Sequence, residues 1–260
     1  MWQDYGSILV AAGIALFLVV LACLEIGRLA GHRRLAADPD TARAGNATVE
    51  GAVFALLGLL VAFTFSGAME RWYWRRALVV EEANNIGTAW LRIDALPAAS
   101  QPALRNLFRE YLDARLAAYA AFPDVQKVRA GIAHANELQS RIWTEAMARC
   151  LEPEGEKARL LILPALNAMI DITTTRTVAA ETHPPAIIYV LLILLLLVGA
   201  VMAGFAMAPA PERNWLHMLC FAAVMSVGVY VILDLEYPRV GMIRLDTVDQ
   251  VLHDLRATMN

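Results

Sequence analysis

Four apolar segments of membrane-spanning length constrain the fold of this chain more than any other feature of its sequence. A helix needs about 20 mainly apolar residues to cross a hydrocarbon core of about 30 Å. Stretches of this kind lie at 6–24, 51–69, 186–208 and 215–233. Hydrophobic residues also make up 58% of the 260, which is too many for a soluble domain of ordinary surface. We therefore expect a multi-pass membrane protein.

The first segment has two interpretations, a signal peptide or a membrane helix. The residues before it contain an acid and no base, and no small-x-small cleavage pattern follows promptly. The segment ends at Glu25 and Arg28, which lipid headgroups can solvate. These features favour an uncleaved helix.

The order of the segments predicts two membrane hairpins with a water-facing domain between them. Residues 1–69 hold the first hairpin, 70–185 the inserted domain, 186–235 the second hairpin and 236–260 a tail. In the inserted region acidic and basic residues balance, and apolar residues recur at intervals of three and four. The expected fold class is an all-α membrane protein with four transmembrane helices and a helical extramembrane domain, assembled as an oligomer.

Helix boundaries within the inserted domain follow from its prolines and its apolar stripes. One amphipathic helix covers 103–119, and Arg115 and Tyr119 fall on its apolar stripe. Further helices are expected over about 124–151 and 154–182, with a kink or break at Pro164. The tail is expected to form an amphipathic helix capped by Asp246.

The stretch from Leu60 to Trp90 shows no sign of a turn where the membrane should end. It contains no proline, and after its first ten residues, which are apolar, Gly87 is the one glycine. Trp72, Tyr73 and Trp74, among several arginines, are typical of an interfacial belt. The pattern predicts one helix that continues from the bilayer into water.

Two sets of residues on the second apolar segment suggest packing and conduction. Small residues recur every fourth position at Gly58, Ala62 and Ser66, which allows another helix to approach closely. Bulky apolar residues, including Phe54, Val61 and Phe65, form a second stripe. This stripe is either a packing or lipid-facing surface, or a pore constriction that gates by dewetting. Composition alone does not choose between them.

A polar face follows on the same predicted helix. It carries Glu81, Asn84, Asn85 and Thr88. Either this face is the ordinary water-exposed side of a helix, or it lines an aqueous vestibule. Asparagine and glycine lower helix propensity, which is an argument for the vestibule, but both interpretations stay open. Farther along, Asp171 has no assigned role beyond a domain surface, and Arg176 is positioned to pair with a neighbouring carboxylate.

Several functional classes find no support in the sequence. The net charge of −3 provides no general basic face for nucleic acid. The five histidines and three cysteines are scattered, and no hydrolase, zinc, P-loop or dinucleotide motif occurs. We therefore expect no enzyme, no catalytic residues, no cofactor and no metal site.

Three motifs resemble one known family along nearly the whole chain. They are ALLGLLVAFTFSGA at 55–68, EEANNIGTAWLR at 81–92 and ILDLEYPRVGMIRLD at 232–246. Together they resemble the bestrophin-like family of bacterial membrane proteins. The family's name implies similarity to bestrophins, which are homopentameric anion channels with four membrane helices per subunit, a helical cytosolic domain and a hydrophobic neck on the second membrane helix. The acidic cluster that bestrophins use for calcium has no counterpart here, so calcium gating is not carried over.

Membrane orientation is left open by two opposing arguments. The first connecting loop holds Arg28, Arg33, Arg34 and Arg43, so the positive-inside rule places it in the cytoplasm and the inserted domain outside. The resemblance to bestrophins implies the reverse. Arginines near the other helix ends reduce the bias, and we lean slightly to a cytoplasmic domain in a bacterial inner membrane.

These arguments lead to one functional prediction and one alternative. The prediction is a homo-oligomeric ion channel whose second membrane helix lines the pore, with an anion as the ion that the resemblance implies. The expected partners are membrane lipid, inorganic ions and further copies of the chain, with a pentamer as the first guess and a tetramer as the second. The alternative is a non-conducting membrane sensor or scaffold whose helical domain binds a protein partner.

Overall fold

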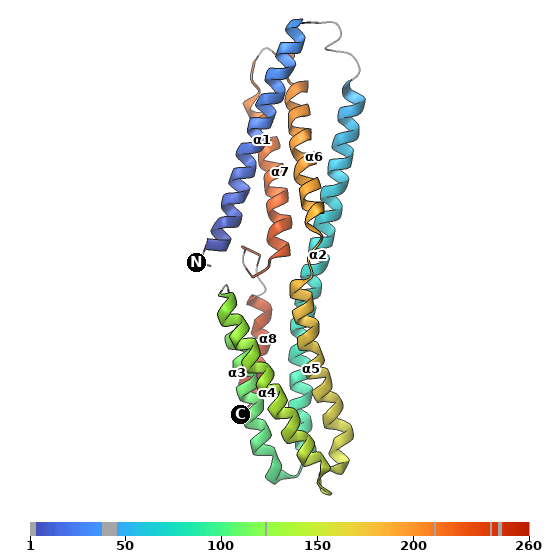
Figure 1. Cartoon of the computed structure of the whole chain (residues 1–260), viewed down its shortest axis with the longest axis vertical. Helices are drawn as coiled ribbons and strands as arrows, with labels where there is room; N and C mark the ends of the chain where they lie inside the picture. The colour runs from blue at the N-terminus through green and yellow to red at the C-terminus, as the bar shows by residue number, and fades with distance from the viewer. Residues whose placement is uncertain are drawn as a thin grey trace. The chain divides into compact units, whose positions relative to one another are not determined.

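A computed structural model describes residues 4–37, 46–122, 124–210, 212–239, 241–243 and 246–259. Within these ranges every regular element is a helix (Figure 1). The long helices are α1 (Asp4–Ala37), α2 (Asn46–Arg92), α3 (Gln101–Ala120), α4 (Val125–Leu151), α5 (Arg159–Glu181), α6 (Ala186–Ala206), α7 (Trp215–Glu236) and α8 (Asp246–Thr258). Short 3₁₀ helices are η2 (Ile93–Ala95), η3 (Ala98–Ser100) and η4 (Glu156–Ala158).

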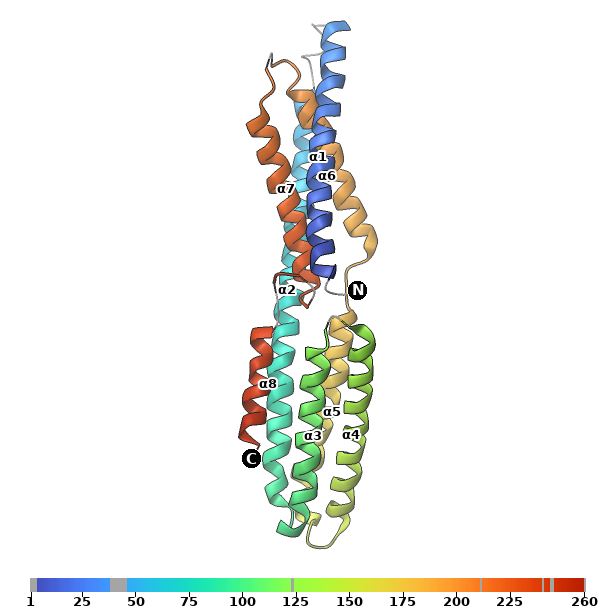
Figure 2. The ribbon, with the colours of Figure 1, turned by 90° about the vertical axis from the view of Figure 1, so that its left-hand side faces the viewer.

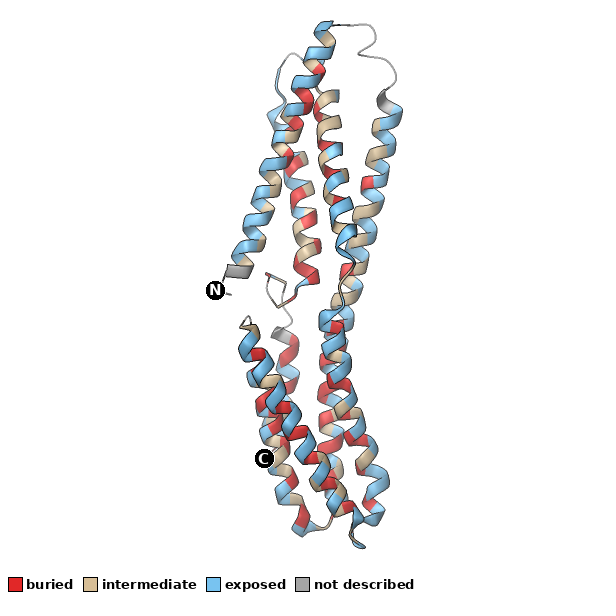
Figure 3. Ribbon diagram, viewed as in Figure 1, coloured by how far each residue is buried: buried red, intermediate tan, exposed pale blue. Residues whose placement is uncertain are grey.

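Four helical segments are long and apolar enough to cross a membrane. They are Gly6–Ala37, Thr48–Ala95, Glu156–Ala206 and Trp215–Glu236. Large apolar side chains on them are left uncovered by the chain, as the exposed positions in Figure 3 show. Phe63 is 66% exposed and Val224 is 70% exposed. Surfaces of this kind are stable where lipid covers them, so the expectation of an all-helical chain with four apolar helices is confirmed.

The chain divides into two compact units. A membrane unit contains Asp4–Glu70 and His183–Tyr237, and a helical unit contains Arg71–Thr182 together with the described residues from Pro238 onward. The helix α2 contributes its first part to the membrane unit and its second part to the helical unit. As the sequence predicts, α2 continues without interruption through Leu60–Trp90.

In the membrane unit α1 packs against α6 and α7 (Figures 1 and 2). Glycines bring the backbones of α1 and α6 into contact. A Cβ added at Gly27 would lie 1.9 Å from the carbonyl oxygen of Val201, and one added at Gly204 would lie 1.9 Å from that of Leu24. Such short distances leave room for glycine alone. This contact is a small-residue interface that the sequence analysis did not identify.

In the helical unit α3 and α4 pack side by side, and α5, α8 and the second part of α2 surround a shared apolar core. Fully buried side chains include Ile86 of α2, Phe108 of α3, Ile142 of α4 and Met169 of α5. The tail helix α8 contributes Leu252, which is also fully buried. Burial of this kind is the main favourable contribution to folding, and it joins the tail helix to the same core as the inserted region.

Helix boundaries in this unit agree with the sequence analysis for α3 and α4, whereas the helix expected from residue 154 begins at Arg159, after the 3₁₀ helix η4. The helix α4 begins after Asp124, whose side chain accepts a hydrogen bond from the backbone N–H of Lys127. The expected break at Pro164 is wrong, because α5 begins at Arg159 and continues through the proline. Proline removes the hydrogen bond to the carbonyl of Leu160. That residue is 79% exposed, so the helix lies at the surface of the unit at this point. The predicted cap of α8, Asp246, has its side chain outside the described part of the chain.

Candidate functional site

The membrane part of α2 presents an open face of small residues. Ala55, Gly58, Ala62 and Ser66 are exposed, and a Cβ added at Gly58 would meet nothing within 4 Å. The opposite side of the helix is used for packing within the subunit, where Leu57 and Ala68 are buried. The predicted small-residue ridge at Gly58, Ala62 and Ser66 therefore has no partner among the described residues of its own subunit.

The three residues predicted to form a constriction lie beside this open face. Phe54 is half-buried, with its ring edge-on to Phe221 of α7 at 6.2 Å between centroids, and it contacts Gly199 of α6. Val61 is half-buried, and Phe65 is 40% exposed. Of the three, Phe65 therefore has the largest exposed fraction.

The polar face in the second part of α2 is open at three of its four predicted positions. Glu81, Asn84 and Thr88 are exposed, and their spacing continues the three-and-four pattern of the open face in the membrane part. Asn85 is different, since its amide donates a hydrogen bond to the carbonyl of Ala168 in α5 at 3.3 Å. Asn85 thus fixes α5 to α2 in addition to any role at an aqueous surface.

The unusual glycine in this region has a packing explanation. A Cβ added at Gly87 would lie 3.3 Å from a methyl group of Leu255 in α8. Real Cβ contacts are seldom so short, so the absence of a side chain allows α8 to lie close to α2. Gly87 therefore does not by itself indicate a vestibule.

Glu82, next to exposed Glu81, is the centre of a buried ion-pair cluster. Its side chain is fully buried, and the guanidinium of Arg115 donates to one carboxylate oxygen at 2.8 Å. Arg176 of α5 donates to the other oxygen, which also accepts a hydrogen bond from the hydroxyl of Tyr119 at 3.2 Å. The cluster joins α2, α3 and α5 through charge-assisted hydrogen bonds. Arg176 thus pairs with a carboxylate of α2, whereas the sequence suggested a neighbouring one.

Tyr119 lies at the centre of three guanidinium groups. Their Cζ atoms are 4.3 Å (Arg176), 4.9 Å (Arg115) and 4.9 Å (Arg239) from the centroid of the tyrosine ring, which is a cation–π arrangement. Burial raises the pKa of the Tyr119 hydroxyl above its ordinary value, so it remains a neutral donor. Burial and the neighbouring Arg239 lower the pKa of Arg176 to about 9, so Arg176 is still charged at neutral pH.

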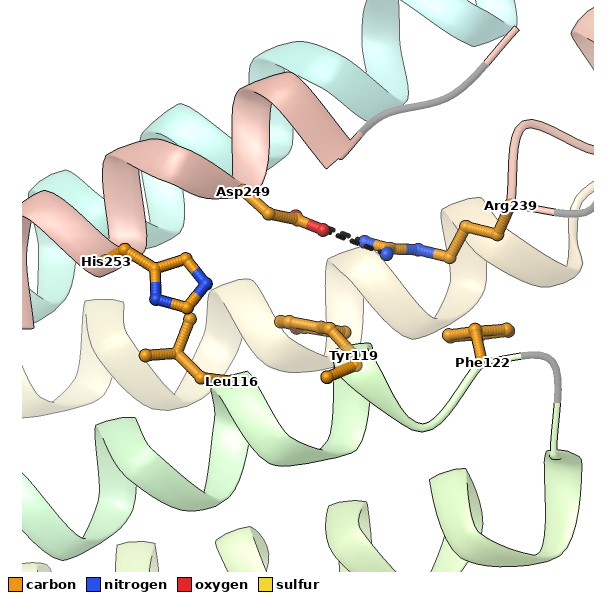
Figure 4. Close-up of a pocket in the computed structure, with 7 residues that line it drawn as sticks. Leu116, Tyr119, Phe122, Arg239, Asp249 and His253 are labelled. Atoms are coloured by element: carbon orange, nitrogen blue, oxygen red, sulfur yellow. Dashed lines mark hydrogen bonds and ion pairs between the residues drawn. The ribbon is translucent and has the colours of Figure 1, made fainter. Parts of the chain in front are cut away.

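Arg239, on the segment between α7 and α8, forms the second ion pair of this region. Its guanidinium donates to both carboxylate oxygens of Asp249 in α8, at 2.9 and 3.2 Å. The pair fixes the tail helix to the segment that follows α7. Beside the pair is a cavity of about 260 Å³, whose walls also include Tyr119, Phe122 and His253 (Figure 4).

The membrane unit contains one further polar contact near the end of α7. Nδ1 of His183 lies 2.9 Å from Oε1 of the buried Glu236, and its ring stacks on Tyr237 with 4.8 Å between centroids. This contact fixes the segment before α6 to the end of α7. In the described ranges no three histidine, cysteine, aspartate or glutamate side chains gather into a metal-binding group.

Comparisons with known proteins complete this description. Among curated proteins no match to the chain is found. A family model described as the bestrophin-like domain matches residues 11–249, so it includes most of the first apolar helix, the other three apolar helices and the helical unit as far as the first turn of α8. The match includes α2 with its open face, the Glu82 cluster, and the Arg239–Asp249 pair. By this match over nearly its whole length, the chain belongs to the bestrophin-like family.

Proposed function

We propose that this protein is a homo-oligomeric ion channel in which α2 of each subunit lines a common pore. The observation that carries the proposal is the open face of α2, where Gly58 has nothing within 4 Å and Ala62 and Ser66 are exposed. Small residues on a membrane helix permit close approach of another helix. A helix that keeps such a face unused within its own subunit is suited to a contact between subunits.

The proposal extends to the parts that the sequence predicts. Two membrane hairpins carry the pore, and the helical domain inserted between them is cytoplasmic, in a bacterial inner membrane. For the subunit number and the ion selectivity of this channel, the family membership favours a pentamer that prefers anions. Phe54, Val61 and Phe65 contribute to the constriction, and Glu81, Asn84 and Thr88 line the aqueous mouth, with Asn85 at its edge.

Purified protein provides the direct test. Native mass spectrometry should show one closed oligomer, and planar-bilayer recordings should show currents that reverse at the potential expected for a selective ion. Silence across voltage, pH and several salts would contradict the channel. A dimer, or a bundle without an axial cavity, would favour the alternative of a sensor or scaffold that binds a protein partner through its helical domain.

Replacing Gly58 by leucine is expected to dissociate the oligomer while each subunit keeps its fold. The open space around Gly58 accommodates leucine within the subunit, but the added side chain blocks the approach of a neighbouring helix. Native mass spectrometry and circular dichroism would measure the two effects separately. Ala223→Leu, a similar enlargement at an exposed position of α7, is the control and should leave the subunit number unchanged. A Gly58→Leu protein with the wild-type subunit number would argue against this interface.

Replacing Phe65 by alanine is expected to raise the single-channel conductance by about twofold or more, because the narrowest apolar ring dominates the resistance of a pore. Phe63→Ala is the matched control, since Phe63 is 66% exposed and lies toward lipid in the proposed arrangement. Single-channel recording measures both variants. Equal conductance in wild type and Phe65→Ala would remove Phe65 from the constriction.

A further inference from the structure

The cavity beside Arg239 is built from three separate parts of the helical unit. The helix α3 provides Leu116 and Tyr119, the residues that follow it provide Phe122, the segment after α7 provides Arg239, and α8 provides Asp249 and His253 (Figure 4). One side of the cavity is therefore apolar and aromatic, and the other side is charged. Ligand sites commonly combine apolar walls with a few fixed polar groups.

Arg239 retains hydrogen-bonding capacity toward this cavity. A guanidinium group has five N–H donors, and the pair with Asp249 uses one on Nη1 and one on Nη2. Among the described residues Asp249 is its one hydrogen-bond acceptor. The side chain is 15% exposed, and it lies within 5.1 Å of the ring centroids of both Tyr119 and Phe122. The remaining donors are thus held in a fixed orientation.

The charges around the cavity favour an anion. Three buried or nearly buried arginines surround Tyr119, and two carboxylates, Glu82 and Asp249, oppose them. Among the described residues that line the cavity itself, Arg239 and Asp249 form a charged pair, and His253 adds no negative charge. In a partly buried site the field of these arginines is screened less than it would be at an open surface, and the guanidinium donors that Asp249 leaves unused can receive the carboxylate of a ligand.

The size of the cavity and the side chains of Leu116 and Phe122 in its wall specify the rest of the ligand. A single inorganic anion would leave most of the 260 Å³ beside Leu116 and Phe122 filled with water. Sites for drug-sized ligands begin at about 300 Å³, so a compound of roughly ten non-hydrogen atoms is the appropriate size. We propose that this cavity is a binding site for a small organic carboxylate, whose carboxylate group accepts hydrogen bonds from Arg239 and whose apolar body lies against Leu116, Tyr119 and Phe122.

Binding would also strengthen the attachment of α8. The ligand would contact α3, the segment after α7 and α8 at once, and a ligand that binds the folded state stabilises the elements it joins. We therefore expect slower amide hydrogen exchange in α8 when the site is occupied. This inference stands whether or not the protein conducts ions, because it concerns residues of the helical unit alone.

Fluorobenzoate, followed by fluorine NMR with the full-length protein in detergent, is the probe for this site. Saturable line broadening is expected for fluorobenzoate, and no comparable effect for the neutral fluorobenzamide. Arg239→Gln should weaken binding at least about tenfold, since a hydrogen bond to a charged group is lost. Ala120 also lines the cavity, and Ala120→Leu, which adds bulk at its wall without changing any charge, should weaken probe binding to a similar extent.

Arg256→Gln is the matched control for the loss of charge. Arg256 also joins α8 to α3, through Asp113 at 2.8 Å, but it does not line the cavity. This variant should bind the probe within about twofold of wild type. The proposal is overturned if wild type shows no saturable binding, or if Ala120→Leu and Arg239→Gln both bind as well as wild type. It is also overturned if chloride or phosphate at equal ionic strength displaces the probe as effectively as unlabelled benzoate does.

Discussion

Replacing Glu82 by glutamine is expected to lower the free energy of unfolding by about 3–5 kcal/mol, which is the usual effect of removing one partner from a buried ion pair. Glutamine preserves the volume of the side chain but not its charge. Arg115 and Arg176, with side chains 3% and 9% exposed, would then be left as buried cations without their carboxylate. Removing an acid that bridges three helices should loosen α2, α3 and α5 together.

Thermal unfolding of the full chain in detergent, followed by circular dichroism, measures this effect. The midpoint for Glu82→Gln should fall by on the order of 10 °C. Glu81→Gln is a closely matched control, because the neighbouring residue is exposed and most surface substitutions change stability by less than about 0.5 kcal/mol. Similar midpoints for the two variants would show that the cluster contributes little to stability.

The second large effect is expected at the contact between α1 and α6. In Gly204→Ala the new methyl carbon would meet the carbonyl oxygen of Leu24 at 1.9 Å and its carbonyl carbon at 2.7 Å. Both atoms belong to a helix backbone, so the two helices must separate. Overpacking of this kind costs about 1–3 kcal/mol and sometimes more, and here it also weakens the adjacent contact at Gly27. We expect a lower unfolding midpoint and a reduced yield of folded protein.

Gly228→Ala provides the comparison, since a Cβ at Gly228 in α7 would meet nothing within 4 Å. That substitution should be neutral or slightly stabilising, because alanine is the better helix former by about 0.5–1 kcal/mol. The midpoints of thermal unfolding, measured for both variants in the same detergent, would distinguish them. If Gly204→Ala were as stable as Gly228→Ala, the backbone contact between α1 and α6 would not be as close as the structure has it.

Local patterns were enough to predict the helices and the continuity of α2. The apolar runs and the proline positions are both short-range signals, so the boundaries of α3 and α4 follow closely from them. Pro164 was the exception. The free-energy cost of a proline inside a helix depends on the surroundings of the carbonyl that loses its hydrogen bond, here that of Leu160. Those surroundings are a tertiary property, which the sequence does not show.

The buried cluster was only partly predictable, because it depends on which helices become neighbours. Arg115 on an apolar stripe is a local signal that an arginine is buried, and it could have been noticed. Its partner Glu82 could not be chosen over the adjacent Glu81 without knowing which side of α2 faces α3. Arg75 shows the same limit. Its place among interfacial aromatics suggests contact with lipid phosphate, but it donates to the carbonyls of Ala179 and Thr182 at the end of α5.

The cavity beside Arg239 had no sequence signal at all. Its walls come from positions near 119, 239 and 249–253, and each is unremarkable in its own segment. The glycine contact between α1 and α6 was partly predictable, since Gly27 and Gly31 have the small-xxx-small spacing of close helix pairs. That spacing shows that a helix can be approached closely, but not which helix approaches it.

The pairing of α1 with α6 also has a consequence for biosynthesis. The ribosome must translate residues 38–185 after α1 before the first residue of α6 is made. At about 5–20 residues per second this takes on the order of ten seconds. During that interval Gly27 and Gly31 have lipid, or a membrane-insertion factor, in place of their final neighbour. The nascent chain therefore completes its membrane half late, and truncation before α6 should leave a first helix that is inserted but unassembled.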